Sequence, residues 1–361
     1  MNIAELEIKI KNNDTRLKEQ FFQYKHTFPL ESGKSLPEFQ LCYSTWGKLN
    51  ESKDNVIWIC HALTANSDAE DWWCGLFGKG NFFDPEKYFI VCANVLGGCY
   101  GSTGPLSINP ETGKPYYHSF PTLTIRDIVL AFDLLREDLG INTIHTVIGG
   151  SLGGQQALEW SVLRPGLFEH QILIATNAKH SPWGIAFNES QRLAINADST
   201  WNEDHELAGQ EGLKAARSIA LLSYRNYHTY QEKQSEDTES KFDGFRASSY
   251  QKYQGEKLVK RFNAFTYWVL SKTMDSHNIA RGRKSCEEVL KENKTSSLVI
   301  GIKSDVLFPI EEQTFIHENL SNSTFKEIDS LYGHDGFLIE TDQINKIFED
   351  YFKSKALISK K

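Results

Sequence analysis

The sequence predicts a doubly wound α/β fold, in which a mostly parallel β-sheet carries helices on both faces. Continuous apolar runs at residues 55–60 and 88–94 are typical of parallel strands that are covered on both sides. A helical repeat at 124–139 and a third apolar run at 144–148 follow, so strands and helices alternate along the chain. In such sheets ligands bind beyond the carboxyl ends of the strands.

Further elements extend this sheet at its start. Strand-like runs at 21–28 and 39–45, joined by a turn at Ser32-Gly33-Lys34, suit an antiparallel edge. Residues 1–20 are polar and rich in lysine, and we expect a loosely held arm there.

Clear end signals define the helix at 124–139. Thr124 is a good N-cap, and Gly140 can end the helix. Its apolar residues recur at helical spacing: Ile125, Ile128, Val129, Phe132, Leu135 and Leu139. A strand at 171–175 comes after the run at 144–148.

A helical insertion interrupts the sheet. Residues 181–293 have no strong strand run, and we expect them to form a lid over the functional edge. Within the insertion, 210–224 is amphipathic, 231–241 is polar and disordered-looking, and 255–274 is rich in aromatic residues.

The sheet is predicted to resume at 297–302 and 324–328, followed by a closing helix at 342–353. The predicted division is therefore a first part of the core at 1–180, a lid at 181–293, and a second part of the core at 294–361.

Composition excludes several classes of function. The formal net charge of −8 over 361 residues argues against a nucleic-acid-binding protein. The N-terminus lacks the apolar core of a signal peptide, and no apolar run approaches the ~18 residues that span a bilayer. Six cysteines without a C-x-x-C pair favour free thiols, so we expect a soluble protein of the cytoplasm.

The segment Gly149-Gly150-Ser151-Leu152-Gly153 lies between a predicted strand and a predicted helix. In that context G-x-S-x-G is typical of a nucleophile elbow, where a sharp turn exposes a serine hydroxyl. The alternative is a glycine-rich turn that only packs helix against strand.

A serine nucleophile needs a base to take its proton and an acid to orient that base. In the α/β-hydrolase fold the chain order is Ser, Asp or Glu, then His. Asp305 follows the strand at 297–302, and His334 lies in a glycine-flanked loop after the last strand. His317 also follows Asp305 but falls within a predicted helix, so the predicted triad is Ser151, Asp305 and His334.

An oxyanion hole requires two backbone N–H groups. We expect one from Leu152, directly after the nucleophile, and one from Leu63, in the loop after the strand at 55–60.

The chain resembles the homoserine O-acetyltransferase family, which are α/β-hydrolase-fold acyltransferases of methionine biosynthesis. The resemblance rests on the elbow extended to Trp160 and on these segments: His61-Ala62-Leu63-Thr64, Gly97-Gly98-Cys99-Tyr100-Gly101-Ser102-Thr103-Gly104-Pro105, Ile185-Ala186-Phe187-Asn188-Glu189, Tyr253-Gln254-Gly255 and Gly333-His334-Asp335-Gly336-Phe337.

The resemblance implies acetyl transfer from acetyl-CoA to the hydroxyl of L-homoserine by a ping-pong mechanism through acyl-Ser151. Acyl-CoA is then a co-substrate, with no bound cofactor and no metal, and the family suggests a homodimer through the lid helices. Alternatives that stay open are a succinyl donor, serine as acceptor, a serine esterase or thioesterase on the same fold, and an inactive binding module.

The resemblance also implies substrate-binding roles for Arg217, Tyr224 and Asp335, which would hold the carboxylate and amino groups of homoserine. Arg217 and Tyr224 are seven residues apart on a predicted helix and therefore share a face. Arg225 is a competing candidate for the carboxylate, and the alternative for Arg217 is a solvated charge on an amphipathic helix.

Overall fold

The computed structural model describes residues 16–358, and its centre is an eight-stranded sheet in the order β1-β4-β6-β5-β9-β10-β11-β12. β1 and β4 are antiparallel to each other, β4 is antiparallel to β6, and the other neighbours are parallel. These strands are β1 (Arg16–Tyr24), β4 (Phe39–Trp46), β5 (Val56–Cys60), β6 (Phe89–Ala93), β9 (Ile144–Gly150), β10 (Phe168–Ile174), β11 (Ser296–Ile302) and β12 (Ser323–Ile328). The predicted doubly wound sheet with an antiparallel edge is confirmed.

Helices connect the strands and form the segment between β10 and β11. The longer ones are α3 (Ile125–Asp138), α4 (Leu152–Leu163), α5 (Pro182–Asn196), α6 (Gln210–Tyr224), α7 (Tyr227–Gln234), α8 (Arg246–Val259), α9 (Ala264–Asp275), α10 (Cys286–Glu292), α11 (Ile310–Asn319) and α13 (Thr341–Ile358). Short elements are α2 (Ala69–Trp72), η1 (Cys74–Leu76), η2 (Tyr117–Ser119), η3 (Gly333–Asp335), α12 (Gly336–Ile339), and the hairpins β2 (Phe28–Pro29) with β3 (Ser35–Leu36) and β7 (Ile108–Asn109) with β8 (Lys114–Pro115).

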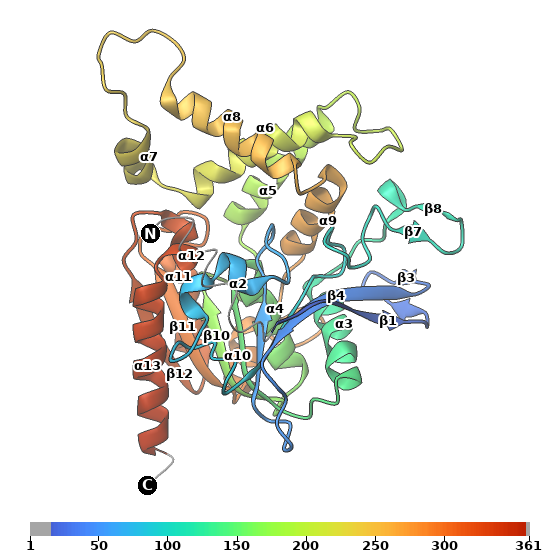
Figure 1. Ribbon diagram of the computed structural model, residues 1–361, viewed down its shortest axis with the longest axis vertical. Helices are drawn as coiled ribbons and strands as arrows, with labels where there is room; N and C mark the ends of the chain where they lie inside the picture. Colours follow the sequence, from blue (N-terminus) through green and yellow to red (C-terminus); the bar gives the residue numbers. More distant parts are fainter. Residues whose placement is uncertain (1–15, 359–361) are drawn as a thin grey trace.

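Two hydrophobic cores lie on opposite faces of the sheet, as the period of two in β5 requires. Trp58 faces α3 and α4, where its ring centroid is 5.0 Å from that of Trp160. Ile57 and Ile59 face the other core, which includes Phe348 of α13. Figure 1 shows α5 to α9 gathered above one end of this layered core, and their role as a lid stays a prediction. The proposed division at residues 181 and 293 stays a prediction.

Several predicted boundaries needed correction. Residues 16–20 belong to β1, because they pair with β4 and Gln20 Nε2 donates to Thr45 Oγ1 at 2.9 Å; the rest of the predicted arm lies outside the described residues. The start of the polar segment 231–241 is helical as part of α7, whose N-terminus has a capping box at Asn226. The aromatic segment 255–274 is broken between α8 and α9, where Asn263 caps α9.

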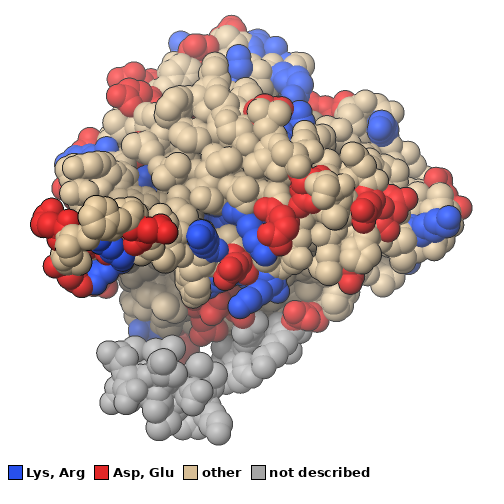
Figure 2. All heavy atoms as spheres, turned by 90° about the horizontal axis from the view of Figure 1, so that it is seen from above, with Lys and Arg blue, Asp and Glu red and all other residues tan. Residues whose placement is uncertain are grey.

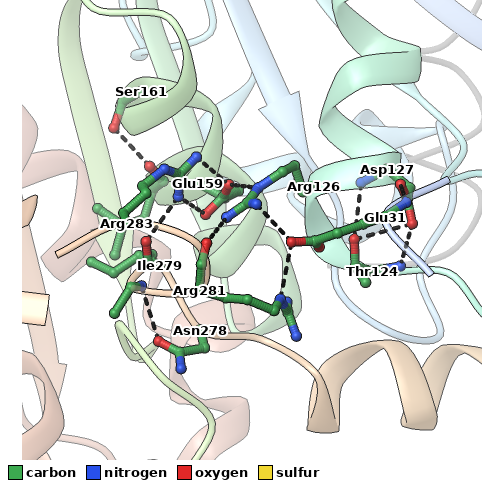
Figure 3. Close-up of polar contacts among 12 residues, drawn as sticks. Glu31, Thr124, Arg126, Asp127, Glu159, Ser161, Asn278, Ile279, Arg281 and Arg283 are labelled. Carbon is green, nitrogen blue, oxygen red and sulfur yellow. Dashed lines mark hydrogen bonds and ion pairs between the residues drawn. The ribbon is translucent and has the colours of Figure 1, made fainter. Parts of the chain in front are cut away.

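A cluster of charged side chains fastens the chain where it returns from the lid to the core (Figure 3). Glu159 of α4 accepts hydrogen bonds from Arg283 at 2.7 and 3.0 Å and from Arg126 Nε at 2.7 Å. Glu31 Oε1 accepts from Arg126 Nη1 at 2.6 Å and from Arg281 Nε at 3.0 Å. The Glu159 side chain is 3% exposed, so removing its partners would leave a buried charge, at a cost of roughly 3–5 kcal/mol.

The surface on the lid side mixes acidic and basic side chains with a large uncharged area (Figure 2). It lacks the continuous basic stripe that is typical of nucleic-acid binding. None of the helices within residues 16–358 is long and apolar enough to cross a membrane.

Candidate active site

Ser151 lies in a tight turn between β9 and α4. Its backbone has φ 58° and ψ −126°, a strained conformation that surrounding contacts must hold. The Ser151 N–H donates to Ile174 O at 3.0 Å, and its carbonyl accepts from Thr176 Oγ1 at 2.9 Å. Both partners lie at the end of β10, so the neighbouring strand fixes the turn.

Glycine is required at position 153, because a Cβ there would lie 2.0 Å from the backbone oxygen of Cys60. The first turn of α4 therefore packs directly against the end of β5. This approach brings the loop that contains Leu63 next to the nucleophile.

Asp305 and His334 form a buried pair. His334 Nδ1 lies 2.6 Å from Asp305 Oδ2, while Asp305 Oδ1 accepts from the N–H groups of Leu307 and Phe308 at 2.8 and 2.9 Å. A carboxylate oxygen that accepts from Nδ1–H leaves the lone pair of the imidazole ring on Nε2. The ring of Phe308 stacks on that of His334 with centroids 5.1 Å apart.

Packing connects the His334 loop to the elbow. The centroid of the Phe337 ring lies 5.4 Å from that of the His334 ring. A Cβ on Gly150 would come within 2.5 Å of the Phe337 ring. Among the described residues, neither His334 Nε2 nor Ser151 Oγ has a hydrogen-bond partner. The structure therefore brings the two loops together without a direct hydrogen bond between Ser151 and His334. Such bonds often tighten only once substrate is bound.

The two expected oxyanion donors are tied together by Gln156. Leu152 is the first residue of α4, so its N–H has no acceptor within the helix, and Leu63 lies in the turn after β5. Gln156 Nε2 donates to Leu152 O and to His61 O, both at 3.1 Å. The elbow and the Leu63 loop are thus held in one arrangement.

His61 holds the other end of the Leu63 loop. Its Nε2 accepts from the Val95 N–H at 3.0 Å, and its Nδ1 donates to Ala62 O at 2.9 Å. Burial lowers the pKa of His61 to about 4, so the ring is neutral at neutral pH. A cavity of about 10 Å³ behind this loop is lined by Leu63 and Ala65, among others.

Gln156 and His61 were not among the sequence-based candidates, although both lie in the motifs quoted above. The signal that could have indicated Gln156 is its polar side chain, which lies on α4 among ten consecutive buried residues. A buried amide needs partners, and here they are the backbones of both halves of the oxyanion site.

Arg217 and Tyr224 lie on one face of α6, with the Arg217 guanidinium carbon 5.2 Å from the centroid of the Tyr224 ring. The Arg217 Nε and Nη1 atoms are buried and have no hydrogen-bond partner among the described residues. The Tyr224 ring is 5.9 Å from that of His334. An unsatisfied cation therefore lies near the predicted base.

Asp335 does not face the site alone, because it forms an ion pair with Arg225. Each of the two side chains is 17% exposed. Arg225, the competing candidate for a carboxylate, is thus engaged by Asp335, whereas Arg217 is the cation left without an anionic partner. The expected role of Asp335 toward an amino group stays a prediction.

Comparison with known proteins agrees with this architecture. Residues 55–341 match a family model described as the alpha/beta hydrolase fold. The chain is 53% identical over 334 residues to homoserine O-acetyltransferase from Cyclobacterium marinum, covering 92% of this chain and 95% of that protein. It is 47% identical to the protein of that name from Chloroherpeton thalassium, covering 91% and 88% of the two chains.

Among solved structures, homoserine O-acetyltransferase from Bacillus anthracis superposes with a TM-score of 0.84 at 27% identity, covering 91% of this chain and 95% of the other. Esterase E22 superposes with a TM-score of 0.83 at 24% identity, covering 91% and 99%, and this similarity shows the fold alone. The identity to the first group extends over nearly the whole of both chains. The chain therefore belongs to the homoserine O-acetyltransferase family of α/β-hydrolase-fold proteins.

Proposed function

We propose that the protein transfers an acetyl group from acetyl-CoA to the hydroxyl of L-homoserine, as the names of its relatives suggest, through an acyl-Ser151 intermediate. Asp305 orients His334, whose Nε2 takes the proton from Ser151 Oγ as that oxygen attacks the thioester carbonyl. The N–H groups of Leu63 and Leu152 stabilise the negative oxygen of the tetrahedral intermediate. The C–S bond then breaks, and the CoA sulfur leaves with the proton from His334.

In the second half-reaction His334 Nε2 takes the proton of the homoserine hydroxyl, and that oxygen attacks the acyl carbonyl. The Ser151 Oγ–acyl bond breaks, Oγ regains its proton from His334, and O-acetylhomoserine departs. Transfer succeeds only if water is kept from the acyl-serine, which gives the lid a physical purpose.

The observation that carries the proposal is the half-buried guanidinium of Arg217, whose Nε and Nη1 atoms are buried and have no hydrogen-bond partner among the described residues. Buried N–H groups of a cation are costly to leave unpaired, so the arrangement is suited to a ligand that brings a carboxylate. Guanidinium groups bind carboxylates bidentately. This feature favours an amino-acid acceptor over a simple ester, because a neutral ester or water would leave Arg217 unpaired.

The amino group of homoserine needs a second contact, and we propose Asp335 for it. Asp335 uses Oδ2 for Arg225, which leaves Oδ1 for an ammonium group. Tyr224, between Arg217 and His334, would contact the bound amino acid.

The test is to incubate the protein with acetyl-CoA alone and locate the acetyl group by peptide mass spectrometry. We expect one acetyl group on the peptide that contains Ser151, and its discharge as O-acetylhomoserine when homoserine is added. Ser151→Ala should carry none. An adduct on another residue, or no adduct while acetyl transfer proceeds, would contradict the double displacement.

Parallel reactions resolve the open alternatives. Succinyl-CoA in place of acetyl-CoA tests the donor, and serine in place of homoserine tests the acceptor. Discharge to water as fast as to homoserine would instead assign an esterase or thioesterase.

We also propose that the lid helices form a homodimer interface. Leu193, Leu222 and Tyr253 of α5, α6 and α8 are more than half exposed and supply apolar area that a second subunit would cover. Sedimentation of Leu222→Glu should then report a monomer where the unmodified protein reports a dimer. The six free cysteines support a reducing compartment such as the cytoplasm.

A further inference from the structure

Two histidines and a glutamate meet at the amino-terminal ends of two central strands, away from Ser151. His145 is the second residue of β9, and Glu169 and His170 lie near the start of β10. The two strands are parallel neighbours, with His170 opposite Thr146. Ser151 follows the far end of β9, so this cluster is separated from the proposed chemistry by the length of the strand.

The geometry of the cluster is close to that of a metal site. One ligand atom of each side chain lies within 4.8 Å of those of the other two. Around a tetrahedral zinc ion such atoms are roughly 3.3 Å apart, since each Zn–ligand bond is ~2.0–2.1 Å long. Glu169 is exposed and can close this difference by rotating its side chain.

Hydrogen bonds orient both imidazole rings. His145 Nδ1 lies 2.8 Å from Thr146 Oγ1, and His170 Nδ1 lies 3.3 Å from the hydroxyl of Tyr351. The Tyr351 hydroxyl is in turn 2.9 Å from Ser296 Oγ. Hydroxyl groups that accept from Nδ1–H leave the lone pair on Nε2 of each ring, which is how metal-binding histidines are commonly prepared.

Aromatic packing limits the movement of the two rings. The ring of Phe352 in α13 stacks on His145 with centroids 5.7 Å apart, and it meets His170 edge-on at 5.0 Å. A ligand held by both histidines would therefore also fix the contact of α13 with the sheet.

The surrounding charges favour a cation. Glu169 forms no ion pair with any of the described residues, and Asp54 is close enough to act electrostatically on both Glu169 and His145. Lys355 is the positive group that acts on His170. Asp54 and Glu169 therefore place two carboxylates at the cluster, with Lys355 as the ammonium group beside His170.

We propose that His145, Glu169 and His170 bind a divalent transition-metal ion of the zinc class, with water completing the coordination. Two imidazole nitrogens and one carboxylate are a donor set that zinc accepts. The site lies far from Ser151, so its effect is on stability: a metal that binds only the folded chain raises its melting temperature.

Binding is tested on the full chain without an affinity tag, after treatment with EDTA and dialysis, by titration with ZnCl₂ in a calorimeter. We expect one ion per chain. Glu169→Gln and His170→Gln each remove a ligand, so each should weaken binding by more than the roughly 10- to 100-fold that loss of an outer-shell partner costs, and should abolish the rise in melting temperature. Because Glu169 is exposed, Glu169→Gln keeps the test valid if His170→Gln does not fold.

The matched control is His317→Gln. His317 likewise has its Nδ1 against a serine hydroxyl, at 2.7 Å, and its ring on a phenylalanine, Phe325. Zinc affinity should be unchanged in this variant. Absence of stoichiometric binding, or equal affinity in the Glu169, His170 and His317 variants, would overturn the proposal. Acetyl transfer is measured in the same variants. Because the metal site lies far from Ser151, we expect the same rate of acetyl transfer with and without zinc.

Discussion

The two sides of the site are built differently. On the core side, backbone contacts fix the nucleophile: Ser151 bonds to the end of β10, and Gly153 lies directly on Cys60. On the lid side, the Tyr224 ring of α6 lies 5.9 Å from that of His334, and the buried Nε and Nη1 atoms of Arg217 have no hydrogen-bond partner among the described residues. The difference teaches that the backbone holds Ser151 in place before any ligand binds, whereas the proposed acceptor site relies on side chains that a bound substrate would complete.

Removing the nucleophile should have the largest effect. Ser151→Ala should lower kcat for acetyl transfer by roughly 10⁶-fold, because the other groups have no hydroxyl to activate. The measurement is CoA release with acetyl-CoA and homoserine. Ser190→Ala, at an exposed serine of α5, is the control and should keep full activity. Comparable kcat values for the two variants would remove Ser151 from the mechanism.

Removing the lid cation should affect the acceptor only. Arg217→Ala should raise KM for homoserine by roughly 10- to 100-fold, the worth of a hydrogen-bonded ion pair, while acylation of Ser151 keeps its rate. Lys214→Ala, one turn earlier on α6, is the matched control and should leave KM unchanged. Loss of acylation itself in Arg217→Ala would show that the two sides are not separable.

Acid should lower the free energy of unfolding through the buried His61 on the core side. The pKa of His61 is about 4 in the folded chain and near 6.5 when unfolded, so the unfolded chain binds more protons between these values. The contribution of neutral His61 to the free energy of unfolding is fully present above pH 6.5 and is lost as the pH falls toward 4. By pH 5 this loss is about 2 kcal/mol.

Urea unfolding at pH 7.5 and 5.0 measures the effect, with His61→Gln as the comparison. The unmodified protein should lose about 2 kcal/mol more than the variant between the two pH values. Glu312, whose pKa burial raises to about 7, acts in the opposite direction in both proteins and cancels in the difference. Identical pH dependence would mean that His61 does not titrate as its surroundings require.

The smallest effect concerns the link between the two oxyanion donors. Gln156→Leu removes the hydrogen bonds to His61 O and Leu152 O. The burst of CoA that is released when Ser151 is first acylated should then be roughly tenfold slower, with KM for homoserine unchanged. A merely structural role would lower the melting temperature and leave the burst rate per folded molecule intact, so both quantities are measured.

Much of the fold could be predicted because its signals are local. The run at 144–148, the N-cap Thr124 and the amphipathic segment 210–224 correspond to β9, α3 and α6. Strand ends without such signals were missed. β10 begins at Phe168 rather than 171 because Glu169 and His170 join the ladder despite their polarity.

The site was predictable only where chain order carries information. The order of Ser151, Asp305 and His334 indicates a triad, and the structure places Asp305 against His334. The pairing of Asp335 with Arg225 joins segments 110 residues apart, and no spacing rule reveals it. The same holds for Gln156, whose partners are backbone oxygens that every residue possesses.

The lid insertion separates the two halves of the core along the chain, and this order has a consequence during protein synthesis. Ser151 leaves the ribosome before the lid, and Asp305 and His334 leave after it. A chain that stops before Asp305 then holds Ser151 without the two residues that the proposed mechanism pairs with it. On that mechanism such a fragment could not acylate Ser151 and would not consume acetyl-CoA.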